Sequence, residues 1–138
     1  MPVYREKLRY TTQGHGHMLD LTQDVAKVCN RAGVSDGLVN LFVVGSTAAI
    51  GTIEFEPGLL KDFPNLLDKL APPGRNYAHE ATWHDGNGHS HLQATLLGPS
   101  LTIPLESGAL ALGQWQQVFL IECDVRSRQR TVIVSVLS

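Results

Sequence analysis

The sequence is poor in cysteine, in net charge and in long apolar runs, and each shortage excludes a class of protein. Cys29 and Cys123 are the two cysteines among 138 residues, whereas a small secreted domain held together by disulfides usually has more. No apolar run is long enough to cross a bilayer, and residues 1–7 lack the apolar core of a signal peptide. We therefore expect a cytoplasmic protein without a membrane partner.

Charge is almost balanced, with 11 basic and 13 acidic residues and a net charge of -2. Such a chain has no general attraction for nucleic acid, so we expect no nucleic-acid partner. Hydrophobic residues make up 43% of the chain, which is typical of a globular protein. The length fits one domain over residues 1–138.

The hydrophobic pattern predicts an α+β fold, a compact sandwich of mostly antiparallel strands with two or three short helices. One helix is expected to begin with Thr22 as its N-cap and to end at Gly33, and a second begins at Pro57 and is kinked or divided at Pro64. The apolar run over 38–44 predicts a strand covered on both faces. Residues 76–90 are expected to form a long functional loop. Further strands are expected over 3–10, 18–21, 50–55, 91–97, 101–104, 116–123 and 129–136.

Four of the six histidines lie between positions 79 and 91, at His79, His84, His89 and His91. Imidazole is the commonest metal ligand and exchanges protons near neutral pH. If a strand begins at His89, His89 and His91 point to the same face and could bind one ion, and His79 or a carboxylate would be the third ligand. The alternative is a solvated, histidine-rich turn without chemistry.

Glu54 and Asp85 are the carboxylates that could complete such a site. Glu54 follows a predicted strand, where it is equally well explained as an exposed acid at a sheet edge. Glu56, two residues later, is better explained as a charge that stabilises the start of the helix at Pro57.

Small hydroxyl residues and arginines are candidates for binding an anion. Ser46 and Thr47 follow the buried strand and could hold a phosphate or a water, although a structural turn explains them equally well. Arg126, Arg128 and Arg130 alternate near the last strand and share one face if extended, which predicts either an anion site or a solvated edge. Other isolated residues favour structural roles: Trp115 as a packing anchor, both cysteines as core residues, and His15 and His17 as turn residues.

The chain resembles the YjbQ-like family (UPF0047), whose members are often labelled secondary thiamine-phosphate synthase enzymes. The resemblance covers nearly the whole chain, and Ser46-Thr-Ala, Glu54 and Glu56-Pro57 fit it. It is carried mainly by the segments Asn76-Tyr-Ala-His, Asp85-Gly-Asn-Gly-His-Ser-His-Leu, Leu97-Gly-Pro-Ser-Leu-Thr-Ile-Pro and Leu112-Gly-Gln-Trp-Gln-Gln.

This resemblance implies a small α+β sandwich that assembles as a homotrimer, and a thiamine phosphate synthase activity. That activity joins a pyrimidine diphosphate to a thiazole phosphate and releases pyrophosphate. By similarity, His79 and His91 match the shared histidines of the family, Glu54 its acid, and Ser46 and Thr47 its hydroxyl pair.

The chain departs from the family at Gly45, where many relatives have a histidine directly before the Ser/Thr pair. Relatives with that histidine often lack one at the position of His89. We therefore hypothesise that His89 replaces the missing ligand.

Two functions follow from these residues. In the first, a transferase acts on a phosphorylated small molecule: His79, His89 and His91 hold a divalent metal or move protons, Glu54 or Asp85 orients water, and Ser46 assists. Thr47, Arg126 and Arg128 would bind the anionic ligand. Imidazole ligands favour Zn²⁺ over Mg²⁺. In the second, the same residues form a non-enzymatic binding site for a metal or metabolite, which the scarcity of basic residues around the histidines favours.

Overall fold

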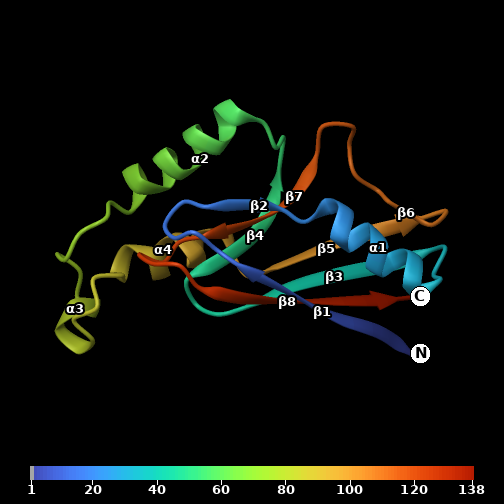
Figure 1. The fold of residues 1–138 in the computed structure, drawn as a ribbon, viewed down its shortest axis with the longest axis horizontal. Coiled ribbons are helices and arrows are strands. Elements are labelled where there is room, and N and C mark those ends of the chain that lie inside the picture. The colour runs from blue at the N-terminus through green and yellow to red at the C-terminus, as the bar shows by residue number, and fades with distance from the viewer. Residues whose placement is uncertain (1) are drawn as a thin grey trace.

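The structure, a computed structural model, describes residues Pro2–Ser138 and contains two antiparallel sheets (Figure 1). The larger sheet has the strand order β1–β8–β3–β5–β6, and the smaller has the order β2–β7–β4. The strands of the larger sheet are β1 (Val3–Thr11), β3 (Gly37–Val44), β5 (Ser100–Glu106), β6 (Ala109–Leu110) and β8 (Gln129–Leu137). Those of the smaller sheet are β2 (Met18–Asp20), β4 (Ala48–Ile53) and β7 (Gln117–Glu122).

The main core lies between these two sheets and the helix α1 (Thr22–Ala32). Alternate residues of β3 and β8 point into it, as the period of two in a strand requires. Each buried valine or leucine of this kind stabilises the fold by roughly 1.5–3 kcal/mol. Paired across the two strands are Val39 with Val136, Leu41 with Val134, and Val43 with Val132, all of them buried.

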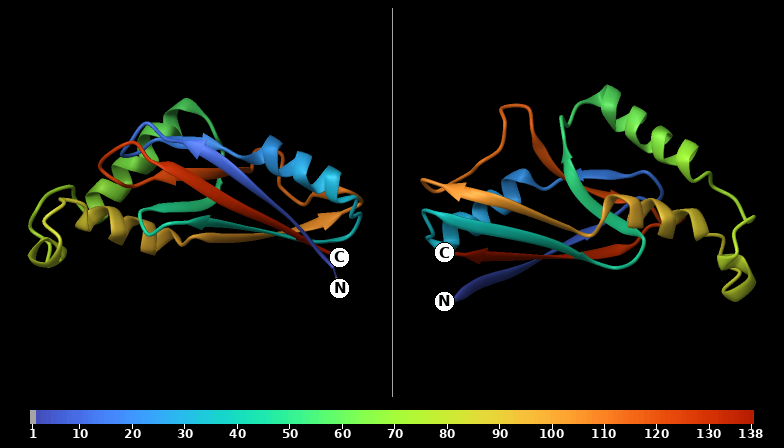
Figure 2. Two further views of the ribbon diagram at one scale, coloured as in Figure 1. Left: turned by 60° about the horizontal axis from the view of Figure 1, so that its bottom comes forward. Right: turned by 180° about the vertical axis from the view of Figure 1, so that it is seen from behind.

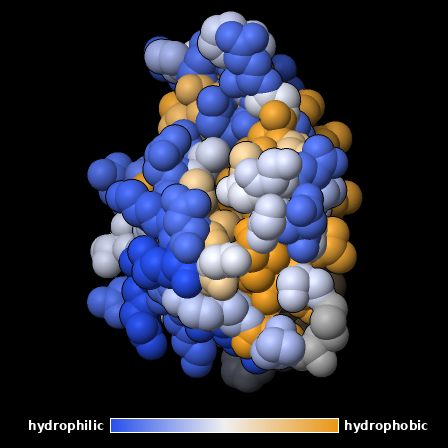
Figure 3. All heavy atoms as spheres, turned by 90° about the vertical axis from the view of Figure 1, so that its right-hand side faces the viewer, coloured by the Kyte–Doolittle hydropathy of each residue, from blue (hydrophilic) through white to orange (hydrophobic). Residues whose placement is uncertain are grey.

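The opposite face of the larger sheet has no helix over it (Figure 2). Leu38, Phe42 and Val44 of β3 point to this face and are 47%, 41% and 50% exposed. The prediction that residues 38–44 are covered on both faces is therefore wrong, because α1 and the smaller sheet both lie on the inner side. At the end of the molecule where the termini lie, apolar residues form a band between polar flanks (Figure 3).

Helix α1 ends as predicted, at Gly33 with a left-handed φ of 68°. Its start differs from the prediction, because Leu21 is the N-cap and makes no side-chain capping bond. The Thr22 hydroxyl instead accepts a hydrogen bond from the Val118 N–H at 2.9 Å. Thr22 therefore ties the helix to β7 rather than capping it.

Helix α2 (Pro57–Leu70) is one continuous helix that contains Pro64. It is therefore not divided into two short helices at this proline. The Glu56 carboxylate caps its first turn and accepts from the N–H groups of Gly58 and Leu59 at 2.8 and 2.6 Å. This confirms the helix-start role predicted for Glu56. Together with α4, α2 covers the outer side of the smaller sheet in a second core of Met18, Ala49, Leu67, Ala94, Phe119, Ile121 and Cys123.

The segment expected to be one long loop contains α3 (His79–Thr82) and the start of α4 (Gly88–Leu97). The strand predicted over 91–97 is therefore wrong. Helix α4 reverses the usual pattern, because Gln93 is buried whereas Leu92 and Leu96 are 47% and 64% exposed. The Gln93 amide donates to Asp68 Oδ1 and to the Ala71 carbonyl, which satisfies it inside the protein.

The α+β class and the mostly antiparallel strands are confirmed. Over Pro2–Ser138 the structure has four helices rather than two or three. Both cysteines are buried, as predicted. None of the helices in this range combines the length and apolar character needed to cross a bilayer.

Candidate functional site

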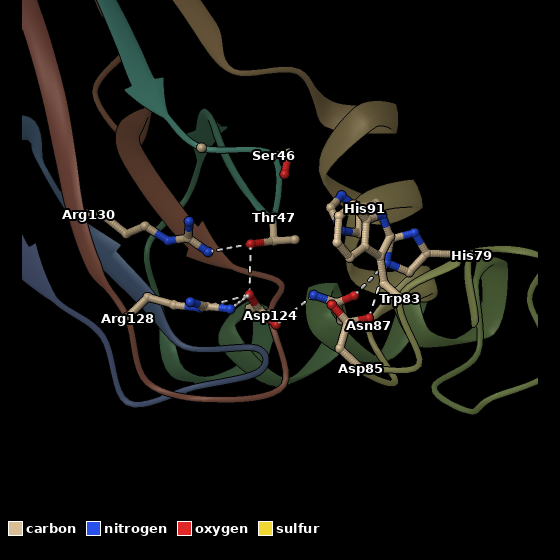
Figure 4. A pocket seen from close by; sticks show the side chains of 11 residues that line it. Ser46, Thr47, His79, Trp83, Asp85, Asn87, His91, Asp124, Arg128 and Arg130 are labelled. Carbon is tan, nitrogen blue, oxygen red and sulfur yellow. Dashed lines mark hydrogen bonds and ion pairs between the residues drawn. The ribbon is translucent and has the colours of Figure 1, made fainter. Parts of the chain in front are cut away.

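A pocket of about 380 Å³ opens where β3 ends, β4 begins and β8 begins, facing α3 and the first turn of α4 (Figure 4). Antiparallel pairing brings these segments to one end of the sheets, although they are up to 85 positions apart in the chain (130 against 45). The residues that line the pocket are Gly45, Ser46, Thr47, His79, Trp83, Asp85, Asn87, His91, Asp124, Arg128 and Arg130.

Arg130 forms the floor of the pocket on its β8 side. Its guanidinium makes a two-pronged ion pair with the buried Glu122 carboxylate, with 2.9 Å between Nε and Oε1 and 2.5 Å between Nη2 and Oε2. Nη2 also donates to the Thr47 hydroxyl at 2.7 Å. No hydrogen bond from Nη1 to any residue of Pro2–Ser138 is present, so this nitrogen keeps its donors for a ligand.

Arg128 lies beside it and binds Asp124, with Nε and Nη2 at 2.9 and 2.8 Å from Oδ2. Burial by itself would raise the pKa of the Asp124 carboxyl. Hydrogen bonds from the Val125 N–H and from Asn87 outweigh burial, so this pKa lies below its usual value. The carboxylate is thus ionised and holds Arg128 against the pocket wall.

The opposite wall carries two histidines, His79 of α3 and His91 of α4, whose ring centres are 4.6 Å apart. His79 Nε2 lies 2.9 Å from Asn87 Oδ1 and 3.2 Å from Asp85 Oδ1, and both oxygens are acceptors. Nε2 therefore carries a proton in this arrangement. The pKa of His91 is lowered, first by burial and then by the neighbouring His79, which favours a neutral ring able to accept a proton.

A continuous chain of hydrogen bonds joins the two walls (Figure 4). Arg130 donates to the Thr47 hydroxyl, which donates to Asp124 Oδ2 at 3.0 Å. The Asn87 amide donates to Asp124 Oδ1 at 3.3 Å and accepts from His79. The arginine wall and the histidine wall are therefore fixed relative to each other.

Gly45 leaves the space that Arg130 occupies. Its φ of 141° is disfavoured for other residues, and a Cβ there would lie 2.6 Å from Arg130 Nη1. A histidine at this position, as the resemblance gives for many relatives, would require this guanidinium to move.

Six of the predicted site residues come together in the pocket: Ser46, Thr47, His79, Asp85, His91 and Arg128. Arg126 lines an adjoining hollow together with Asp85 and Arg128. Glu54 is exposed and does not line the pocket. It follows the far end of β4, roughly 20 Å of extended chain from Ala48, where the pocket begins.

The structure separates His89 from the other two histidines. Because residues 88–97 form a helix, successive side chains are 100° apart, so residues at i and i+2 point in nearly opposite directions. His89 is 2% exposed and its ring packs edge-on against His15, 5.2 Å away between centres. The prediction that His89 and His91 share one face is wrong, and His89 is not placed to replace a ligand at Gly45.

The residues present do not fit the expected metal centre of three histidines. Within Pro2–Ser138, no group of three or more histidine, cysteine or acidic side chains is arranged to hold an ion. His79 Nε2 is also committed as a donor to Asn87.

Sequence reasoning missed Asp124, Asn87, Trp83 and Glu122, and gave Arg130 no more weight than its neighbours. The alternation of Glu122, Asp124, Arg128 and Arg130 around one turn was the available signal, since buried arginines need acidic partners. Asn87 and Trp83 carried no signal beyond lying in the histidine-rich segment.

The chain is similar to known proteins over nearly its full length. A model of the "UPF0047 protein YjbQ-like" family matches residues 6–138. A UPF0047 protein of Methanothermobacter thermautotrophicus is 38% identical over 136 residues, which are 99% of this chain and 93% of that protein. A UPF0047 protein of Archaeoglobus fulgidus is 39% identical over 131 residues, which are 95% of this chain and 99% of that protein.

Solved structures agree. A YbjQ-like protein of unknown function from Sulfolobus solfataricus superposes with a TM-score of 0.93 at 33% identity, over 99% of this chain and 98% of that one. A conserved hypothetical protein from Thermus thermophilus gives 0.80 at 36% identity, over 96% and 99%. The fold and the sequence agree over nearly the full length, and the chain therefore belongs to the YjbQ-like UPF0047 family.

Proposed function

We propose that this protein binds a phosphorylated small molecule in the pocket and acts on it by proton transfer. One observation carries the proposal: an unpaired guanidinium nitrogen of Arg130 and the ring of His91, whose lowered pKa favours the neutral form, line the same pocket from opposite walls. Guanidinium groups bind phosphate oxygens with short, charge-assisted hydrogen bonds.

In this mechanism the phosphate lies on Arg128 and Arg130, beside the hydroxyls of Ser46 and Thr47. His91 takes a proton from the reacting group and returns it at the end of the reaction. His79, held through Nε2 by Asn87 and Asp85, packs against the His91 ring and positions it. In the thiamine phosphate synthase reaction, the amino group of the pyrimidine would give its proton to His91 as the C–O bond to the diphosphate breaks, and the arginines would hold the departing pyrophosphate. The thiazole nitrogen would then bond to the methylene carbon, and the proton would return to the amino group.

The test is formation of thiamine phosphate from the two half-molecules, together with binding of inorganic phosphate. H91N should remove turnover and leave phosphate binding nearly intact. R128A should weaken phosphate binding by about tenfold or more, since a hydrogen bond to a charged group contributes roughly 1.5–3 kcal/mol. K7A, which removes an exposed cation of β1 that does not line the pocket, is the control. Full turnover in H91N would refute the proton-transfer role.

A non-enzymatic binding protein is the second candidate, and the pairing of the arginines favours it. Asp124 and Glu122 already neutralise Arg128 and Arg130, so little positive charge remains for a diphosphate. Binding of phosphate without formation of thiamine phosphate from the two half-molecules would support this second function.

Two expectations stay predictions, a divalent metal from the histidine pattern and a homotrimer from the family resemblance. A divalent metal, with Zn²⁺ favoured over Mg²⁺, would take imidazole nitrogens from His79 and His91. A homotrimer would bury apolar surface such as the exposed Phe42 on the outer face of the larger sheet. Light scattering of the wild type and of F42E measures the assembly, and a monomeric wild type would contradict it.

A further inference from the structure

Trp83 is a large apolar side chain at the edge of an otherwise polar pocket. It lines the pocket with the histidines and arginines, yet it is 68% exposed. A tryptophan gains free energy when its ring is covered, so one left open beside a binding pocket needs an explanation.

The backbone beneath Trp83 is held firmly although the ring is not. The Trp83 N–H donates to the His79 carbonyl at 3.1 Å and ends α3. His84 follows in the left-handed region with φ 57°, and its carbonyl accepts from Arg75 Nη1 at 3.1 Å. A non-glycine residue in this region costs free energy, so the turn is maintained by the contacts around it. The turn fixes where the indole ring projects while leaving its surface uncovered.

The ring lies on the histidine side of the pocket, across from the two arginines (Figure 4). A ligand whose phosphate lay on Arg128 and Arg130 and whose other atoms crossed the pocket would meet this wall. We infer that Trp83 is a specificity-determining residue that stacks on a planar unsaturated ring carried by the ligand. The inference rests on the proposed function for the position of the phosphate. It adds that Trp83 selects which group is attached to that phosphate.

The chain supplies its own control, because it has two tryptophans of nearly equal exposure. Trp115, 64% exposed, lies in the segment between β6 and β7 and does not line the pocket. In W115F the fluorescence reports Trp83 alone, and in W83F it reports Trp115 alone. The probes are phenyl phosphate, which has a ring, and methyl phosphate, which has none.

We expect phenyl phosphate to quench W115F and to leave W83F unchanged. In the wild type, calorimetry should show phenyl phosphate binding about tenfold more tightly than methyl phosphate, in line with the contribution of stacking on an aromatic side chain. W83A should lose this preference, and W83F should keep part of it. An unchanged affinity of W83A for methyl phosphate shows that the variant is folded.

Equal affinity of the wild type for the two phosphates would overturn the inference and leave the proposed function standing. Binding of neither phosphate would overturn both. A W115F signal that changes with protein concentration in the absence of ligand would assign the ring to contact between copies of the chain, and would also overturn the inference.

Discussion

Arg130 and Glu122 form an ion pair inside the protein, with side-chain exposures of 7% and 0%. The Glu122 carboxylate also accepts from the Thr12 hydroxyl at 2.7 Å and from the Asp124 N–H at 3.0 Å. The pair therefore joins β7, β8 and the end of β1 directly beneath the pocket.

Removal of the Glu122 charge should destabilise the fold strongly. E122Q keeps the size of the side chain but leaves Arg130 as a buried, uncompensated cation, and we expect the free energy of unfolding to fall by about 3–5 kcal/mol. Urea unfolding measures it. The control is E6Q, since Glu6 pairs with Arg31 at the surface, where ion pairs contribute little. Similar losses in both variants would contradict the role of the buried pair.

Stability should decrease in mild acid. The pKa values of His89 and His91 are both lowered from about 6.5, chiefly by burial, so the folded protein takes up these protons later than the unfolded chain. As pH falls from about 6.5 through the lower folded values, the unfolded state binds more protons and the free energy of unfolding drops.

Urea unfolding at a series of pH values tests this dependence. H91N should flatten the curve, because it removes one of the two groups. H84N, a change of an exposed histidine in the same segment, is the control. A curve for H91N that coincides with the wild type would count against a lowered pKa of His91.

Substitution of Gly45 should weaken ligand binding as well as strain the backbone. G45A adds a Cβ within 2.6 Å of Arg130 Nη1 and should displace the guanidinium, so the affinity for phosphate falls. G108A is the control, because Gly108 also has a positive φ, 80°, but no atom lies within 4 Å of the added Cβ. Both variants should lose about 1 kcal/mol of stability to the strained φ. Unchanged phosphate affinity in G45A would contradict the contact.

Metal analysis of the purified protein measures the zinc prediction directly. If His79 and His91 are ligands, H79A and H91A should lose the metal, whereas H89A should keep the wild-type content because His89 packs against His15. Loss of metal from H89A would restore its proposed ligand role. If the wild type, purified without a chelator, contains no metal, the zinc prediction is wrong.

The two inner strands of the main sheet could be predicted from different signals. Val132, Val134 and Val136 recur every second residue in β8, and Gly37 and Gly45 bound the apolar run of β3. Helix α4 could not, because its buried face carries Ser90 and Gln93 while Leu92 and Leu96 face outward. Hydrophobic patterning assigns such a segment wrongly, since the hydrogen bonds of the buried Gln93 help to hold it and only Ala94 and Leu97 pack against the second core.

The histidine wall of the site could be located from sequence, because the clustering of His79 and His91 is visible in the chain. The arginine wall could only be listed among alternatives. Which of three arginines enters the pocket depends on the turn after β7, where Asp124 selects Arg128, and on Glu122, which selects Arg130. The sequence could not distinguish Glu54 from Asp85 as a candidate. Glu54 lies outside the pocket because β4 runs away from it, and the direction of a strand is known only from the fold.

Arg130 lies in β8, an inner strand that pairs with β1 and β3, so the floor of the pocket is also part of the larger sheet. A mutation that changes the arginine wall of the pocket should therefore also lower the stability of the fold. Mutations in the helical wall, which carries Trp83 and the histidines, should affect stability less. Variation among relatives in ligand preference should consequently gather on α3 and the start of α4. A bound anion should also raise the melting temperature, because it binds the folded protein and not the unfolded chain.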